Sequence, residues 1–146
     1  MHKETGLFSV PVEIEVPFFD VDLMEIVWHG HYIKYFEVAR CALLEELKYN
    51  YAEMKKSGYA WPVIDIRVRY IKPLRFKQVF IVHATLVEID ARLKINYLVI
   101  DKVTGEKLSK AYSVQVAIDM VKKEMCFASP SVFIDKVNHY LLGLKT

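Results

Sequence analysis

The stretch VPFFDVDLMEIVWHGHYIKYFEVAR, residues 16–40, decides what fold this chain takes. Its first part continues a strand pattern and its last part has helical periodicity, so a strand and a helix meet near its middle. Two acids and two histidines lie within twelve residues of this junction, namely Asp20, Asp22, His29 and His31. Because side chains two apart on a strand project to the same face, Asp20 and Asp22 are expected on one side, shortly before the helix begins.

The segments on either side of this junction have clear periods. Residues 10–18 alternate apolar side chains with Glu or Pro, which predicts a strand with one buried face. Pro11 and Pro17 indicate an edge strand or a bulged one. From His31 to about Asn50, apolar residues recur at helical spacing, which predicts the chain's one long amphipathic helix. Its apolar face consists of Tyr32, Tyr35, Phe36, Ala39, Leu43 and Leu47.

The rest of the chain predicts a run of strands closed by a helix. A short helix is expected around residues 51–56, ended by Gly58. Strand patterns follow at residues 64–70, 79–88, 93–101 and 107–121. A hairpin turn is expected at 103–106, and Ser129 and Pro130 predict the N-cap and first position of a last helix. This order predicts an α+β fold, with the helices on one face of a mainly antiparallel sheet.

Length and composition fit a single globular domain, residues 1–146, with 53% apolar and 26% charged residues. The surplus of apolar residues suggests an oligomer. The net charge of +2 comes from 20 basic and 18 acidic residues without a basic block, so no nucleic acid partner is expected. Cys41 and Cys126 form no paired framework, which favours free thiols and the cytoplasm. No signal core and no run of roughly 18 apolar residues is present, so no membrane insertion is expected.

The polar residues at the strand–helix junction suit acyl chemistry. The free N–H groups at a helix start, aided by the helix dipole, can stabilise an oxyanion, and a carboxylate nearby could attack the carbonyl carbon or activate a water. Taken alone, an Asp just ahead of a helix is more often a capping or loop-stabilising carboxylate, and this is the simpler interpretation of Asp22. No metal site is expected, because the spacing of His29 and His31 crosses the junction and no further ligand has helical spacing.

The same stretch resembles the signature of the 4-hydroxybenzoyl-CoA thioesterase branch of the hotdog superfamily, which includes the thioesterases associated with the bacterial Tol-Pal envelope system. Asp22 matches the family's catalytic Asp, residues 26–30 and Tyr32 match the entry to the helix, and residues 35–40 match the helix itself. The resemblance implies a hotdog fold, in which a curved sheet wraps around one long central helix. It also implies an acyl-CoA thioesterase without a cofactor, working as a homodimer or homotetramer whose active site lies at the subunit interface.

In the mechanism that the resemblance implies, the thioester carbonyl docks against the backbone N–H groups of His29 and Gly30, and Asp22 acts as nucleophile or general base. His29 is a second catalytic candidate, which could orient the substrate or assist Asp22. Two residues depart from the family pattern, since Glu25 stands where Gly is usual and His31 where Asn is usual. Glu25 reaches positive φ less easily than Gly, so the loop could take another path, and its charge could alter substrate choice.

Further residues are expected to bind the substrate. Beside the site these are Glu25, His31 and Tyr32. The phosphates of coenzyme A call for basic side chains at the mouth of the site. Candidates are Arg67, Arg69, Arg75, Lys77, Arg92 and Lys94. Arg92 is preferred because it lies in a turn between two predicted strands, where the family gathers basic residues. Glu37 and Arg40 are not expected to be catalytic: their i,i+3 spacing alone suggests a surface ion pair, and the resemblance implies packing and interface residues.

Two other functions fit the same fold. One is a dehydratase or hydratase, which uses a His and an acid across the subunit interface, although nothing in this chain matches the helix motif of that relative. The other is a non-catalytic acyl-CoA or acyl-carrier-protein binding protein, in which Glu25 and His31 mark a decayed site. The acyl group itself stays open, because a pocket built from two subunits cannot be measured from one sequence.

Overall fold

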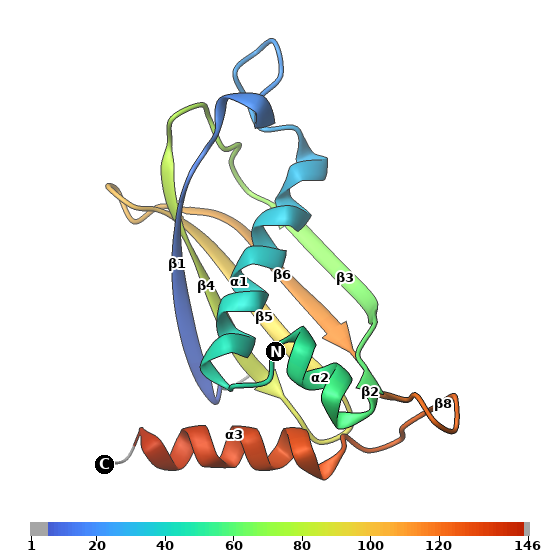
Figure 1. The fold of residues 1–146 in the computed structure, drawn as a ribbon. Helices are drawn as coiled ribbons and strands as arrows, with labels where there is room; N and C mark the ends of the chain where they lie inside the picture. Colours follow the sequence, from blue (N-terminus) through green and yellow to red (C-terminus); the bar gives the residue numbers. More distant parts are fainter. Residues whose placement is uncertain (1–5, 145–146) are drawn as a thin grey trace.

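The computed structural model describes residues 6–144, which form a five-stranded antiparallel sheet with the strand order β1-β4-β5-β6-β3. Its strands are β1 (Phe8–Glu15), β3 (Val63–Tyr70), β4 (Val79–Glu88), β5 (Leu93–Asp101) and β6 (Lys107–Gln115). The long helix α1 (Tyr32–Glu46) lies across one face of this twisted sheet (Figure 1). This is the predicted α+β arrangement, with the central helix and the antiparallel sheet both confirmed.

Shorter elements surround this frame. They are the 3-10 turns η1 (Phe18–Asp20) and η2 (His29–His31), the helices α2 (Tyr51–Ser57) and α3 (Ser131–Gly143), and a small sheet of β2 (Tyr59–Ala60), β7 (Ile118–Asp119) and β8 (Glu124–Met125). The predicted short helix is confirmed as α2, where the Asn50 side chain accepts a hydrogen bond from the Glu53 N–H and Gly58 ends the helix at φ 89°. Helix α3 runs past the far end of the sheet (Figure 1).

The core lies between α1 and the sheet. From α1 it takes the buried Tyr35, Phe36, Ala39 and Leu43, and from the sheet the buried alternate residues of β4 and β5. On those strands the buried residues are Phe80, Val82, Ala84, Leu86, Leu93, Ile95, Tyr97 and Val99. Because full burial of such a side chain contributes about 1.5–3 kcal/mol, this interface holds α1 firmly on the sheet. The position of η2, which leads directly into α1, follows from that packing.

Three element boundaries differ from the expectation. The first strand ends at Glu15 and the chain then forms η1, so Asp20 and Asp22 are not carried by one continuous strand. The predicted strand at residues 107–121 stops at Gln115 and resumes only as the two residues of β7. Pro130, not Ser129, occupies the N-cap of α3, and no side chain caps that helix. Strands β4 and β5 have the predicted bounds.

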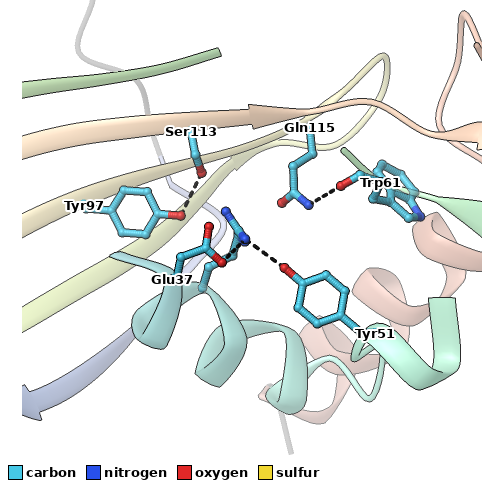
Figure 2. A network of polar contacts seen from close by, with 7 residues as sticks. Glu37, Tyr51, Trp61, Tyr97, Ser113 and Gln115 are labelled. Atoms are coloured by element: carbon cyan, nitrogen blue, oxygen red, sulfur yellow. Dashed lines mark hydrogen bonds and ion pairs between the residues drawn. The ribbon is translucent and has the colours of Figure 1, made fainter. Parts of the chain in front are cut away.

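The pair of Glu37 and Arg40 is not the surface ion pair that its spacing suggested. Arg40 is only 3% exposed, and its guanidinium donates to the Glu37 carboxylate and to the Tyr51 hydroxyl, the latter at 2.8 Å. Burial alone would lower the pKa of Arg40, but the hydrogen bonds to Tyr51 and Glu37 outweigh it and raise that pKa. Figure 2 shows this contact beside the buried hydrogen bond between the hydroxyls of Tyr97 and Ser113. Arg40 therefore joins α1 to α2 inside the molecule.

No helix of residues 6–144 is long and apolar enough to cross a membrane.

Candidate active site

Residues 20–28, between η1 and η2, fold back on themselves as a short hairpin. The Asp22 N–H donates to the Ile26 carbonyl at 2.9 Å, and the Trp28 N–H donates to the Asp20 carbonyl at 3.3 Å. These two hydrogen bonds form an antiparallel pair across the hairpin. The 20–28 hairpin therefore fixes the backbone of Asp22 relative to the residues that enter η2.

The carboxylate of Asp22 is held by the turn of this hairpin. Its Oδ1 accepts hydrogen bonds from the Met24 N–H at 2.8 Å and the Ile26 N–H at 3.3 Å. The side chain is exposed, and within residues 6–144 no donor bonds to Oδ2. One oxygen thus anchors the carboxylate to the backbone while the other is available to a substrate or a water.

Glu25 keeps the turn conformation for which glycine is favoured. Its φ is 61°, in the left-handed region, and its N–H donates to the Asp22 carbonyl at 3.0 Å. Its own carbonyl accepts from the Phe76 N–H at 3.1 Å, so the turn is also attached to the segment before β4. The backbone at position 25 therefore keeps a left-handed turn although the residue is Glu and not Gly. The exposed side chain of Glu25 projects from this turn.

The start of η2 offers unpaired backbone donors. Neither the His29 N–H nor the Gly30 N–H has a hydrogen-bond acceptor in the part of the chain that the structure describes. The His29 carbonyl is fixed by a hydrogen bond from the Tyr70 hydroxyl at 3.1 Å. A Cβ at position 30 would lie 2.2 Å from the Trp28 ring, so this close approach requires glycine. Two adjacent amides are thereby left to bind an oxygen from outside the chain.

A cavity of about 310 Å³ lies where the hairpin, η2 and the end of β3 meet. Its lining consists of Asp22, Val27, Trp28, His29, Tyr32, Tyr70, Ile71, Lys72 and Pro73. Three residues proposed from the sequence, Asp22, His29 and Tyr32, therefore share one cavity. Gly30 is next to it in η2, whereas Glu25, His31 and Arg92 are not part of the lining.

Tyr32 is a wall of this cavity with a fixed hydroxyl. The hydroxyl accepts a hydrogen bond from the Leu74 N–H at 3.1 Å, and the ring packs edge-on against Tyr70 with 4.8 Å between centroids. Burial raises the pKa of Tyr32 above its ordinary value, although the bond from Leu74 opposes this. Tyr32 thus remains a neutral phenol over the ordinary pH range and contributes shape and apolar surface.

Tyr70 and Lys72 line the cavity although the sequence did not single them out. Tyr70 ends β3, where its pattern indicated only a strand residue, and Lys72 follows in the turn before Pro73. The Lys72 ammonium forms an ion pair with Glu106. No local signal identifies either residue, because they come to the cavity only through tertiary packing, in which Tyr70 contacts His29 and Tyr32.

Asp20 occupies a different environment from Asp22, so the expectation that both project to one side is wrong. Asp20 is 1% exposed, and its carboxylate accepts hydrogen bonds from the Lys34 ammonium and the Tyr35 hydroxyl, each at 2.6 Å. The His31 Nδ1 lies 3.8 Å from it. Burial by itself would raise the pKa of Asp20, but the hydrogen bonds from Lys34 and Tyr35 and the nearby positive charges lower it. Asp20 is therefore a buried, ionised and fully engaged carboxylate.

Arg92 lies at the other end of the sheet from the cavity within one chain. It follows β4, whose ten residues separate the loop at residues 74–76 from the turn that carries Arg92. Its guanidinium donates to Glu88 at 2.9 Å, and the same turn touches the start of α3 through the hydrogen bond from the Ser129 N–H to Asp90. Two other basic candidates, Arg75 and Lys77, lie in the segment that holds the 20–28 hairpin.

Metal ligation is not indicated by the geometry. In residues 6–144 no group of three or more His, Cys, Asp or Glu side chains is arranged to hold an ion.

Comparison with known proteins identifies the family of this chain. Residues 16–136 match the model of the thioesterase-like superfamily. The chain is 35% identical to YneP of Bacillus subtilis, a protein assigned as an acyl-CoA thioesterase, over 107 residues that cover 73% of this chain and 78% of YneP. Residues 16–136, the part of the chain that matches the superfamily model, contain both the 20–28 hairpin and α1.

Solved structures share the fold at lower identity. The DHNA-CoA thioesterase of Staphylococcus aureus has a TM-score of 0.78 and 22% identity, covering 94% of this chain and 91% of that one. The protein SAV2348 of Staphylococcus aureus, solved in complex with CoA, has a TM-score of 0.81 and 16% identity, covering 96% of this chain and 88% of that one. These structures show the shared fold, and the family model and the match to YneP establish that the chain belongs to the thioesterase-like superfamily, a group of thioester hydrolases with the hotdog fold.

Proposed function

We propose that this protein hydrolyses acyl-CoA thioesters to free acid and CoA, with Asp22 as the reacting carboxylate. The observation that carries the proposal is the single cavity that Asp22 and His29 both line, since it combines an available carboxylate oxygen with unpaired amides at the start of η2. A thioester carbonyl oxygen bound by the His29 and Gly30 N–H groups would place its carbon within reach of Asp22. Oxyanion stabilisation and carboxylate attack, or carboxylate activation of water, are the two requirements of acyl transfer.

The cavity also suits the two ends of such a substrate. Its volume of about 310 Å³ is at the lower end of the range of ligand sites, and the rings of Trp28, Tyr32 and Tyr70 provide apolar walls for an acyl group. Lys72 at the lining, with Arg75 and Lys77 nearby, could neutralise phosphates of CoA. The assignment of YneP and the CoA complex of SAV2348 support the choice of CoA.

The proposal also gives roles to the other site residues that the sequence suggested. His29 would orient the substrate or assist Asp22 through its imidazole ring, whose centroid lies 5.1 Å from that of the Trp28 ring at the cavity. Glu25 and His31 would act from just outside the lining, where His31 packs edge-on against Trp28. Arg92 would reach bound CoA only if a second subunit brings it there, because it lies far from the cavity of its own chain.

That second subunit is part of the proposed function. Strand β3 is one edge of the sheet, is eight residues long, and exposes the apolar side chains Val63 and Ile64. An exposed edge of this kind is a ready site for pairing with another strand. We propose a homodimer formed through β3, which can associate further into a homotetramer. Free Cys41 and Cys126 support a reducing compartment, the cytoplasm, as the place where it works.

The test is release of free thiol from short aliphatic, long aliphatic and aromatic acyl-CoAs by the wild type and by Asp22→Asn. Loss of the carboxylate is expected to reduce the rate by about 10²- to 10⁴-fold with the fold unchanged. Asp135→Asn, an equally exposed position on α3, is the matched control and should keep the wild-type rate. Full activity of Asp22→Asn would reject the assigned role. Binding of CoA without thiol release by the wild type would favour a binding protein, and hydration of an enoyl-CoA would favour a hydratase.

A further inference from the structure

Asp20 connects two parts of the proposed active site. Through its carboxylate it contacts the start of α1, where Lys34 and Tyr35 each donate a hydrogen bond at 2.6 Å. Through its backbone carbonyl it accepts the hydrogen bond from the Trp28 N–H that closes the 20–28 hairpin. Asp20 itself is buried, with 1% of the residue exposed, whereas the Lys34 side chain reaches it from the surface and is 47% exposed.

Of the other hydrogen bonds of the hairpin, the one from the His31 N–H to the Trp28 carbonyl at 2.9 Å joins it to η2, and two more join it to a different segment. The Val27 N–H donates to the Leu74 carbonyl at 2.9 Å, and the Glu25 carbonyl accepts from the Phe76 N–H at 3.1 Å. Both attach the hairpin to the segment before β4, and neither reaches α1. In the part of the chain that the structure describes, the hydrogen bonds that join the hairpin to α1 are those made by Asp20.

We propose that Asp20 is a positioning residue, which fixes the hairpin bearing Asp22 against the first turns of α1 and so sets the spacing between the Asp22 carboxylate and the His29 and Gly30 amides. This inference rests on the proposed function of that site. The reacting carboxylate belongs to the hairpin, whereas the amides belong to η2, which is continuous with α1. A displacement of about 1 Å between such groups can reduce a rate by about 100-fold.

The strength of this contact depends on the charge of the Asp20 carboxylate. Two donors, one ammonium and one phenol, converge on the two oxygens of Asp20. An Asn of the same shape can still accept from the Lys34 ammonium through its one oxygen and donate to the Tyr35 hydroxyl through its N–H₂ group, but it carries no charge, so the ion pair with Lys34 is lost and both hydrogen bonds become weaker. Asp20→Asn therefore weakens the connection to α1 while keeping the volume of the side chain.

A merely structural role makes a different prediction, because many buried hydrogen bonds stabilise the fold without affecting the reaction. Tyr49 provides the matched control for Tyr35. Its hydroxyl is also buried and bonds to the Ser57 hydroxyl at 2.8 Å and the Trp61 indole N–H at 3.1 Å, but these partners lie beside α2 and β3, away from the hairpin. Tyr35→Phe and Tyr49→Phe thus each remove one buried phenol hydroxyl.

The experiment measures kcat and KM for the best acyl-CoA substrate in Asp20→Asn, Tyr35→Phe, their double variant and Tyr49→Phe. We expect kcat to fall about 10- to 100-fold in Asp20→Asn, with KM within about twofold of wild type. Tyr35→Phe should lower kcat less, and the double variant should resemble Asp20→Asn, because both changes break the same connection. Tyr49→Phe should lower the melting temperature and keep the wild-type kcat.

An unchanged kcat in folded Asp20→Asn overturns the inference, and so does an equal loss of kcat in Tyr49→Phe. Amide resonances give a readout that needs no turnover, since those of His29 and Gly30 should shift in Asp20→Asn and stay in place in Tyr49→Phe. If the wild type releases no thiol, the proposed function fails while the resonances still test the position of Asp20. If Asp22→Asn is inactive but Asp20→Asn is fully active, the proposed function stands and the positioning role is rejected.

Discussion

Among single residues, Glu25 has a backbone conformation that favours glycine. Its φ of 61° lies in the left-handed region, where a residue with a Cβ is strained and glycine is not. Three backbone hydrogen bonds hold the turn in that conformation: the Glu25 N–H donates to the Asp22 carbonyl, the Asp22 N–H donates to the Ile26 carbonyl, and the Phe76 N–H donates to the Glu25 carbonyl. With Glu in place of Gly at this strained position, the protein has an additional charged group close to Asp22.

Glu25→Gly should therefore raise stability and change the reaction together. Relief of strain, less the greater freedom of Gly in the unfolded chain, gives an expected gain of about 0.5–1 kcal/mol in the free energy of unfolding. The loss of the charge should shift acyl preference or the pH dependence of turnover. Denaturant unfolding and a pH–rate series measure the two effects.

Lys123→Gly is the control for this change, because Lys123 also has a positive φ, 57°, in a turn outside the cavity lining. It should be stabilised to a similar extent with its kinetics unchanged. A Glu25→Gly protein with wild-type acyl preference and pH profile would show that the charge is neutral to the reaction.

At the scale of elements, the connection between the hairpin and α1 should make stability sensitive to acid. The pKa of Asp20 in the folded protein is below its ordinary value of 3.8, so the stabilisation from this carboxylate is fully present above about pH 4 and is lost as pH falls through the lowered pKa. Asp101 and Asp119 also have lowered pKa values, through hydrogen bonds from Gln78 and from the Lys122 N–H respectively. The wild type should therefore lose stability from several groups below pH 4.

The variant Asp20→Asn measures how much of this acid-dependent loss of stability comes from Asp20. The variant should be less stable than wild type at pH 6, and the difference between them should shrink as pH is lowered from 4 toward 2, because protonation removes the charge from the wild type as well. Thermal unfolding in this pH series gives the measurement. A difference that is constant down to the lowest pH would mean that Asp20 is not preferentially ionised in the folded state.

The elements themselves were largely predictable, and the connections between them were not. Buried residues recur with a period of two in β4 and β5 and with a helical period in α1. Because apolar residues in the sequence follow the same periods, these elements could be predicted from it. The motif likewise placed Asp22 and His29, which share the cavity. The burial of Asp20 depends on Lys34 and Tyr35, more than a dozen residues away, and no periodicity encodes that contact. Lys72 reaches the cavity in the same way, through tertiary packing alone.

At the scale of the whole molecule, the sheet has two unlike edges. Strand β1 carries Pro11, which cannot donate a ladder hydrogen bond, whereas β3 has no proline and an apolar pair at its start. Val63 and Ile64 are 38% and 58% exposed in the single chain. An edge strand that has no proline and exposes an apolar pair can pair with another strand, and this feature is the basis of the proposed dimer through β3.

Ile64→Lys should therefore convert the proposed dimer to a monomer, because a charge on an edge strand opposes pairing with an identical edge. Val121→Lys is the control, since Val121 is 88% exposed in the turn between β7 and β8 and lies away from β3. Light scattering should give a dimer or tetramer for wild type and Val121→Lys, and a folded monomer for Ile64→Lys. If CoA binding depends on Arg92 of the partner subunit, the monomer should also show a raised KM. Retention of the oligomer by Ile64→Lys would place the interface on another surface.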